Sequence, residues 1–200
     1  MSWTEAVTAF TALFVVIDPI GLTPIFVALT AGMAPARRRA IALRACAIAA
    51  GLLVAFAVLG EAVLGFLGIS MPAFRIAGGL LLFLTALEML FERRSKRRED
   101  RADDPTDDPS VFPLALPLIA GPGAIATMIL LSDGADAAGI AQGIGVMLAV
   151  VALCLAFFSL ATPIERLLGA VGITVVTRVL GMLLAALSVQ FVLDGLSAVL

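Results

Sequence analysis

Residues 14–26 read FVVIDPIGLTPIF, an apolar run that is interrupted by a carboxylate, two prolines and a glycine. A second interruption lies in residues 116–129, LPLIAGPGAIATMI. Proline removes a backbone donor and glycine adds conformational freedom, so each cluster is expected to kink or unwind a helix. Unwound backbone is costly in lipid unless it faces protein or a wet cavity. The two stretches therefore predict two broken membrane helices that line a site.

The composition places both interruptions in a membrane protein. Of the 200 residues, 62% are hydrophobic and only 14% are charged, whereas about a quarter of a soluble domain is charged. A transmembrane helix needs about 20 apolar residues, and the sequence contains six runs of that kind. The expected spans are residues 6–31, 40–60, 66–91, 111–131, 139–163 and 170–198.

The basic residues are distributed very unevenly between the loops. If the chain crosses the membrane six times, 11 of the 13 basic residues fall on one side, and the opposite loops carry only acidic residues. The positive-inside rule then makes the basic side cytoplasmic. We therefore expect a multi-pass protein of the bacterial inner membrane with both termini on the periplasmic or extracellular side. The basic loop residues are Arg37, Arg38, Arg39, Arg44, Arg93, Arg94, Lys96, Arg97, Arg98, Arg101 and Arg166.

The residue inventory argues against several classes of site. The chain has no histidine, and its two cysteines, Cys46 and Cys154, lie singly in apolar runs where they are expected to be core residues. No HExxH, GxSxG or paired-cysteine motif is present. We therefore expect no catalytic residues, no metal site and no bound cofactor, and nucleic acid is not an expected partner. The lipid bilayer is the expected surrounding, and no motif indicates an oligomeric state.

The two halves of the chain can be aligned at an offset of 103 positions. Residues 18–19 (Asp-Pro) then meet residues 121–122 (Gly-Pro), and Arg75 meets Arg178. Because each half has three spans, the second half must enter the membrane from the opposite face, which makes an inverted repeat. The expected fold is an all-α polytopic membrane protein with two inverted three-helix repeats, whose first and fourth spans are broken near the midplane. The first repeat covers residues 1–91 and the second covers 111–200.

Residues 92–110 form the one long polar linker, which is basic in its first part and acidic in its second. A solvated cytoplasmic connector is one interpretation of this segment. Contacts of its arginines with lipid headgroups are the other.

Asp18 is the ionisable residue that is hardest to explain as a packing feature, because carboxylates at this depth usually face a cavity. Arg75 and Arg178 are its candidate partners, although Arg75 could instead reach to the membrane surface. The N-termini of the half-helices could bind an anion. The breaks could alternatively serve packing alone. Thr23 and Thr127, which lie near the two breaks, could merely hydrogen-bond the broken backbone. The expected substrate-binding residues are Asp18, Pro19, Gly21, Thr23, Pro24, Gly121, Pro122, Gly123, Thr127, Arg75 and Arg178.

Three stretches carry a family resemblance. DPIGLTPIF (18–26), FRIAGGLLLFLTALEML (74–90) and PLALPLIAGPGAIATMI (113–129) resemble the MarC family of six-span bacterial and archaeal inner-membrane proteins. Some members of that family are described as transporters of small neutral amino acids. The resemblance implies the same topology for this chain, with motif positions at Asp18, Pro19, Gly21, Pro24, Gly121, Pro122 and Gly123 and with Arg75 in the third span.

Together these features predict a transporter of a small polar solute, chiefly small neutral amino acids, that works by alternating access at a midplane site between the repeats. If transport is coupled to H⁺ or Na⁺, Asp18 is the expected ion carrier. A non-transporting membrane scaffold or assembly factor and an intramembrane enzyme are the alternatives. The scaffold predicts that no solute binds, and the enzyme needs a second carboxylate at the depth of Asp18.

Overall fold

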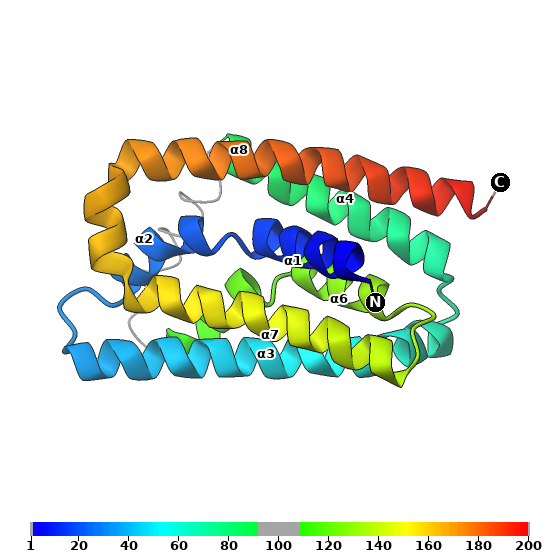
Figure 1. Cartoon of the computed structure of the whole chain (residues 1–200), viewed down its shortest axis with the longest axis horizontal. Coiled ribbons are helices and arrows are strands. Elements are labelled where there is room, and N and C mark those ends of the chain that lie inside the picture. Colours follow the sequence, from blue (N-terminus) through cyan, green and yellow to red (C-terminus); the bar gives the residue numbers. More distant parts are fainter. Residues whose placement is uncertain (1, 92–108, 200) are drawn as a thin grey trace.

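The computed structural model describes residues 2–91 and 109–199 (Figure 1), and within these ranges all regular structure is helical. Residues 92–108, which make up nearly all of the predicted linker, lie outside the described residues. The helices are α1 (Trp3–Ile17), α2 (Pro19–Leu29), α3 (Pro35–Phe66), α4 (Met71–Leu90), η1 (Ser110–Ile119), α6 (Pro122–Ser132), α7 (Ala137–Ser159) and α8 (Ala161–Ser197).

The described helices are long and apolar enough for up to six membrane spans. α1 and α2 together form one, α3, α4 and α7 form one each, and Val171–Ser197 of α8 forms another. η1 and α6 make the remaining span if they are counted as one, with a bend of 55° between them. The prediction of an all-α polytopic membrane protein is therefore confirmed.

Several predicted helix boundaries were wrong. The second span is longer than predicted, because α3 continues to Phe66 until Gly68, at φ 68°, turns the chain. The third span accordingly starts at Met71, where the side chain of Ser70 caps α4, and not at residue 66. α8 begins before the predicted sixth span, and its apolar part follows a bend at Gly169, which has φ 62°.

Figure 1 shows that consecutive spans run in alternating directions, so that the first span and the fourth span cross the bundle in opposite senses. α2 and α6 are both 11 residues long and both have proline at their first position, Pro19 and Pro122. These starts lie 103 positions apart, which is the offset of the sequence alignment. The two ends of the chain lie toward the same end of the bundle (Figure 1). These features agree with an inverted repeat, and the division into two three-helix repeats stays a prediction.

α4 and α8 pack against each other at unusually short range. A Cβ atom on Gly79 would lie 2.8 Å from the backbone oxygen of Ser188, and one on Gly181 would lie 3.0 Å from Cβ of Met89. In lipid the hydrophobic effect does not drive helices together, so close packing of small residues is a main cause of helix–helix association. Gly79 and Gly181 therefore hold the third helix of one half against that of the other. The two cysteines, Cys46 and Cys154, are buried and not disulfide-bonded, as predicted for core residues.

Replacement of Gly79 by alanine is expected to destabilise the protein by about 1–3 kcal/mol, because the new methyl group meets rigid backbone of α8. Gly51 in α3 is the matched control, since nothing lies within 4 Å of its Cβ position. Gly51→Ala should be neutral or slightly stabilising, because alanine favours helix. Thermal unfolding of the two purified variants in the same mild detergent measures the difference. Equal melting temperatures would show that α4 and α8 do not depend on this contact.

Candidate functional site

The first break is centred on Asp18, which ends α1 and begins α2. Its backbone is left-handed (φ 54°, ψ 64°), and its side chain is only 1% exposed. The backbone N–H of Asp18 donates to the Phe14 oxygen at 2.9 Å, so α1 closes normally. Its Oδ1 accepts the N–H of Gly21 at 3.0 Å and so caps α2. Asp18 therefore serves both helix ends at once, through its backbone N–H in α1 and through its side chain in α2.

Gly21 fits this cap because it has no side chain. A Cβ atom at this position would overlap Oδ2 of Asp18. Thr23, one turn into α2, donates its hydroxyl to the Pro19 oxygen at 2.9 Å. Thr127 makes the corresponding bond in α6, to the Gly123 oxygen at 2.8 Å. Both hydroxyl protons are thus used by the backbone near the breaks, as the backbone alternative for the threonines predicted.

The second break follows η1, an irregular segment whose backbone is non-helical at Phe112, Leu116 and Pro117. Near its end the Ala120 N–H donates to the Ala115 oxygen, five residues earlier, at 2.9 Å. Gly121 then turns the chain into α6 in an extended conformation and offers no side-chain cap. Pro122 carries no N–H. The amides of Gly123 and Ala124 are therefore the first donors that the N-terminus of α6 can offer.

The start of α6 packs directly on α1 and α4. A Cβ atom on Gly123 would lie 2.7 Å from Cδ2 of Leu82 in α4 and 3.1 Å from Cγ1 of Val16 in α1. Val16 lies two residues before Asp18, so the two breaks lie close to each other. This contact surrounds the break with protein on two sides, as unwound backbone in a membrane requires.

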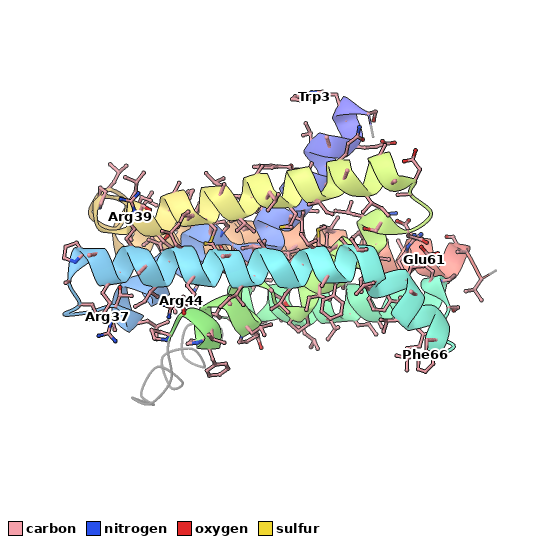
Figure 2. All side chains as sticks on the ribbon, turned by 90° about the horizontal axis from the view of Figure 1, so that it is seen from below. Trp3, Arg37, Arg39, Arg44, Glu61 and Phe66 are labelled. Carbon is pink, nitrogen blue, oxygen red and sulfur yellow. The ribbon has the colours of Figure 1, made fainter. Side chains whose placement is uncertain are left out.

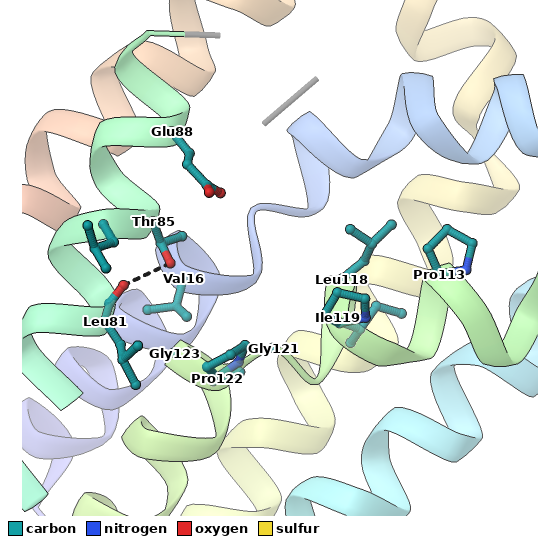
Figure 3. A pocket seen from close by; sticks show the side chains of 13 residues that line it. Val16, Leu81, Thr85, Glu88, Pro113, Leu118, Ile119, Gly121, Pro122 and Gly123 are labelled. Atoms are coloured by element: carbon teal, nitrogen blue, oxygen red, sulfur yellow. Dashed lines mark hydrogen bonds between the residues drawn. The ribbon is translucent and has the colours of Figure 1, made fainter. Parts of the chain in front are cut away.

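A cavity of about 320 Å³ lies beside the second break. The second half lines it with η1, Gly121 and the start of α6, and the first half lines it with α1 and α4 (Figure 3). Its lower part is Gly121 and the start of α6, and η1 and α4 form its walls. The lining residues are Val16, Leu81, Leu84, Thr85, Glu88, Pro113, Pro117, Leu118, Ile119, Gly121, Pro122, Gly123 and Ala124.

The cavity combines three kinds of polar group with apolar walls. Among the described residues that line it, Glu88 has the one charged side chain, and this side chain is half-buried. Thr85, three residues earlier on α4, donates its hydroxyl to the Leu81 oxygen at 3.0 Å, shown dashed in Figure 3. Gly123 and Ala124, whose amides are the first donors of α6, line the cavity together with these α4 residues. Such a site can hold a negative group near α6 and a positive group near Glu88.

Comparison with known proteins places this chain in a family. Residues 3–200 match the profile described as MarC family integral membrane protein. The chain belongs to the MarC family. It is 37% identical to the UPF0056 membrane protein YvbG of Bacillus subtilis, with 98% of this chain and 96% of that protein covered. It is 35% identical to YhcE of Escherichia coli, with 95% and 91% covered.

A further MarC-like relative is the UPF0056 membrane protein of Aquifex aeolicus, 36% identical over 97% of this chain and 93% of its own. These names describe a membrane location and give no activity. No solved structure matches the chain. The family resemblance predicted from the three motifs is thus confirmed, and its function must be argued from the site.

The predicted site residues of this MarC-family chain separate into two groups. Gly121, Pro122 and Gly123 line the cavity. Asp18 is buried and is not one of the lining residues. Val16, two positions earlier on α1, lines the cavity instead. The remaining residues of the two breaks also lie outside the lining: Pro19, Gly21, Thr23, Pro24 and Thr127.

Arg75 has a different partner from the one hypothesised. Its Nη2 lies 2.9 Å from Oδ2 of Asp133, and the two side chains are 30% and 28% exposed. The reason is their depth: Arg75 stands one turn inside α4 and Asp133 follows the end of α6, whereas Asp18 is mid-span. Arg75 therefore ties the first half to the second at the end of the bundle away from Arg37–Arg39. Arg178 is exposed on α8.

Sequence reasoning missed Glu88, which is not among the predicted site residues. A signal was available, because residues three or four apart share one helix face. Thr85 and Glu88 stand on the same face as Leu81 and Leu84, so a polar strip on α4 could have been predicted.

Proposed function

We propose that this MarC-family protein is a secondary transporter of small zwitterionic solutes, chiefly neutral amino acids such as glycine, alanine and serine. One observation carries the proposal. A single cavity inside a polytopic membrane bundle joins the amide donors at the start of α6 to the carboxylate of Glu88. A zwitterion is the solute whose two charges match these two groups.

The chemistry of an amino acid fits the two ends of the cavity. Its carboxylate would accept hydrogen bonds from the N–H groups of Gly123 and Ala124, where the helix dipole favours negative charge. Its ammonium group would bind Glu88 through a charge-assisted hydrogen bond. The cavity, at about 320 Å³, is at the small end of the roughly 300–1,000 Å³ range of ligand sites. Small side chains against Leu81 and Leu84 are therefore favoured.

The arrangement of the halves supports alternating access. The cavity runs from the break at Gly121 toward Pro113 and Glu88, which are close to the ends of their helices at the basic end of the bundle. We define the basic end as the end that carries Arg37–Arg39 at the start of α3. If this end is cytoplasmic, as the positive-inside rule predicts, the cavity is open to the inside. An inverted repeat supplies an equivalent arrangement for the other side.

Counterflow in proteoliposomes tests the proposal. Vesicles loaded with unlabelled alanine should take up labelled glycine, alanine or serine faster than empty vesicles or vesicles without protein. Lysine and glutamate serve as controls, because each adds a charge that the cavity does not match. Thermal unfolding of the purified protein with the same solutes reports binding independently of flux. If no amino acid is exchanged and none raises the melting temperature, the transporter proposal is wrong and a non-transporting scaffold is favoured.

A further inference from the structure

A second cavity, of about 420 Å³, lies at the basic end between α2, α3 and α7. It is separate from the proposed transport site and shares no lining residue with it. Its polar wall is made by Arg38 and Arg39 in the first turns of α3, and its apolar wall by Phe26 and Phe158. None of these residues has a role in the proposed transport.

The apolar wall is a buried aromatic pair. Phe26 and Phe158 are buried and stacked, with ring centroids 4.5 Å apart and an angle of 11° between the rings. The guanidinium carbon of Arg38 lies 5.7 Å from the centroid of the Phe26 ring. An arginine over an aromatic face is held in place by the ring quadrupole. Arg38 thus lies over the Phe26 ring and also lines the cavity.

The electrostatics of this cavity favour an anion. Within residues 2–91 and 109–199, no acidic side chain forms an ion pair with Arg38 or Arg39. α3 also begins here, at Pro35, with no side-chain cap from Ala34, so the positive end of its dipole adds to the arginine charges. Figure 2 shows Arg39 on the side of α3 that carries α7 and Arg37 on the opposite side.

We infer that this cavity binds a phosphate group, and that the phosphate belongs to the headgroup of an anionic phospholipid. Guanidinium groups bind phosphate through paired hydrogen bonds. Basic pockets between membrane helices on the cytoplasmic side are suited to anionic headgroups. The cavity is lined by Pro35, the first residue of α3, so it lies at one end of the second predicted span. A headgroup there can keep its acyl chains in lipid while its phosphate contacts Arg38 and Arg39.

Native mass spectrometry of the full chain in detergent tests this inference. The protein is mixed with phosphatidylglycerol, with phosphatidylcholine or with inorganic phosphate, and the retained ligand is counted. Wild-type protein should retain phosphatidylglycerol in preference to phosphatidylcholine. Arg38→Gln and Arg39→Gln should each weaken that retention by about tenfold or more, because each removes a charged donor. Arg37→Gln, which removes the same charge from the other side of α3, should not.

The outcomes separate the two sources of phosphate. Retention of phosphatidylglycerol that fails only in the Arg38 and Arg39 variants supports the lipid site. Equal retention of inorganic phosphate with the same dependence on these arginines supports the phosphate site but assigns it to a soluble ligand. If the three variants bind lipid alike, the attraction is general and the inference is overturned. Arg39 is exposed, so its variant should fold even if Arg38→Gln does not.

Discussion

Glu88→Gln is expected to weaken the exchange of small neutral amino acids by roughly 10–100-fold, because a charge-assisted hydrogen bond in a partly desolvated site contributes about 1.5–3 kcal/mol. Among the described residues that line the cavity, Glu88 is the one with a charged side chain. The amide keeps the size and polarity of the side chain and removes the charge that an ammonium group needs. Initial rates of counterflow with labelled alanine, measured across alanine concentrations, report the change. The loss should appear mainly as a raised KM.

The matched control is Glu61→Gln. Glu61 is an exposed carboxylate on α3, at the end of the bundle opposite Arg37–Arg39 (Figure 2). Its replacement removes the same charge without touching the cavity and should leave exchange unchanged. Both variants should melt close to wild type. Wild-type exchange by Glu88→Gln would exclude this carboxylate as the ammonium partner, and a similar loss in Glu61→Gln would indicate an effect of net charge alone.

Much of the fold could be predicted because the bilayer restricts it so strongly. A span must be apolar over about 20 residues, and such runs are visible in composition alone. The breaks were visible too, since proline and glycine change the backbone locally: α2 starts at Pro19 and α6 at Pro122. The irregular course of η1 was not predicted, although Pro113 and Pro117 interrupt this segment.

The site was harder to predict, because it depends on which face of each helix meets another helix. Arg75 and Asp133 are 58 positions apart, and their ion pair exists only because the start of α4 and the end of α6 meet. Glu88 lines the cavity because α4 presents that face to η1 and α6. The same applies to Arg38, which packs over Phe26 of another helix. Spacing along one helix can suggest a polar face, but only packing selects its partner.

Replacement of Asp18 is expected to separate two roles, as the cap of α2 and as the proposed carrier of a coupled ion. Asp18→Ala should destabilise the protein by about 2–4 kcal/mol, because alanine cannot cap and is disfavoured in the left-handed conformation. Asn caps well and tolerates that conformation, so Asp18→Asn should stay within about 1 kcal/mol of wild type. If Asp18 carries H⁺ or Na⁺, Asp18→Asn should still perform counterflow but lose accumulation driven by an ion gradient.

A double-mutant cycle with Gly21 checks the cap itself. A methyl group on Gly21 would overlap Oδ2 of Asp18, so Gly21→Ala should be strongly destabilising in the wild-type background. In an Asp18→Ala background the overlapping oxygen is gone, and the same change should be much less costly. Coupling of about 0.5–3 kcal/mol is usual for residues in direct contact. Additive effects of the two changes on thermal unfolding would show that the Asp18 carboxylate does not hold the start of α2. For the second role, gradient-driven accumulation that persists in Asp18→Asn would show that Asp18 does not carry the coupled ion.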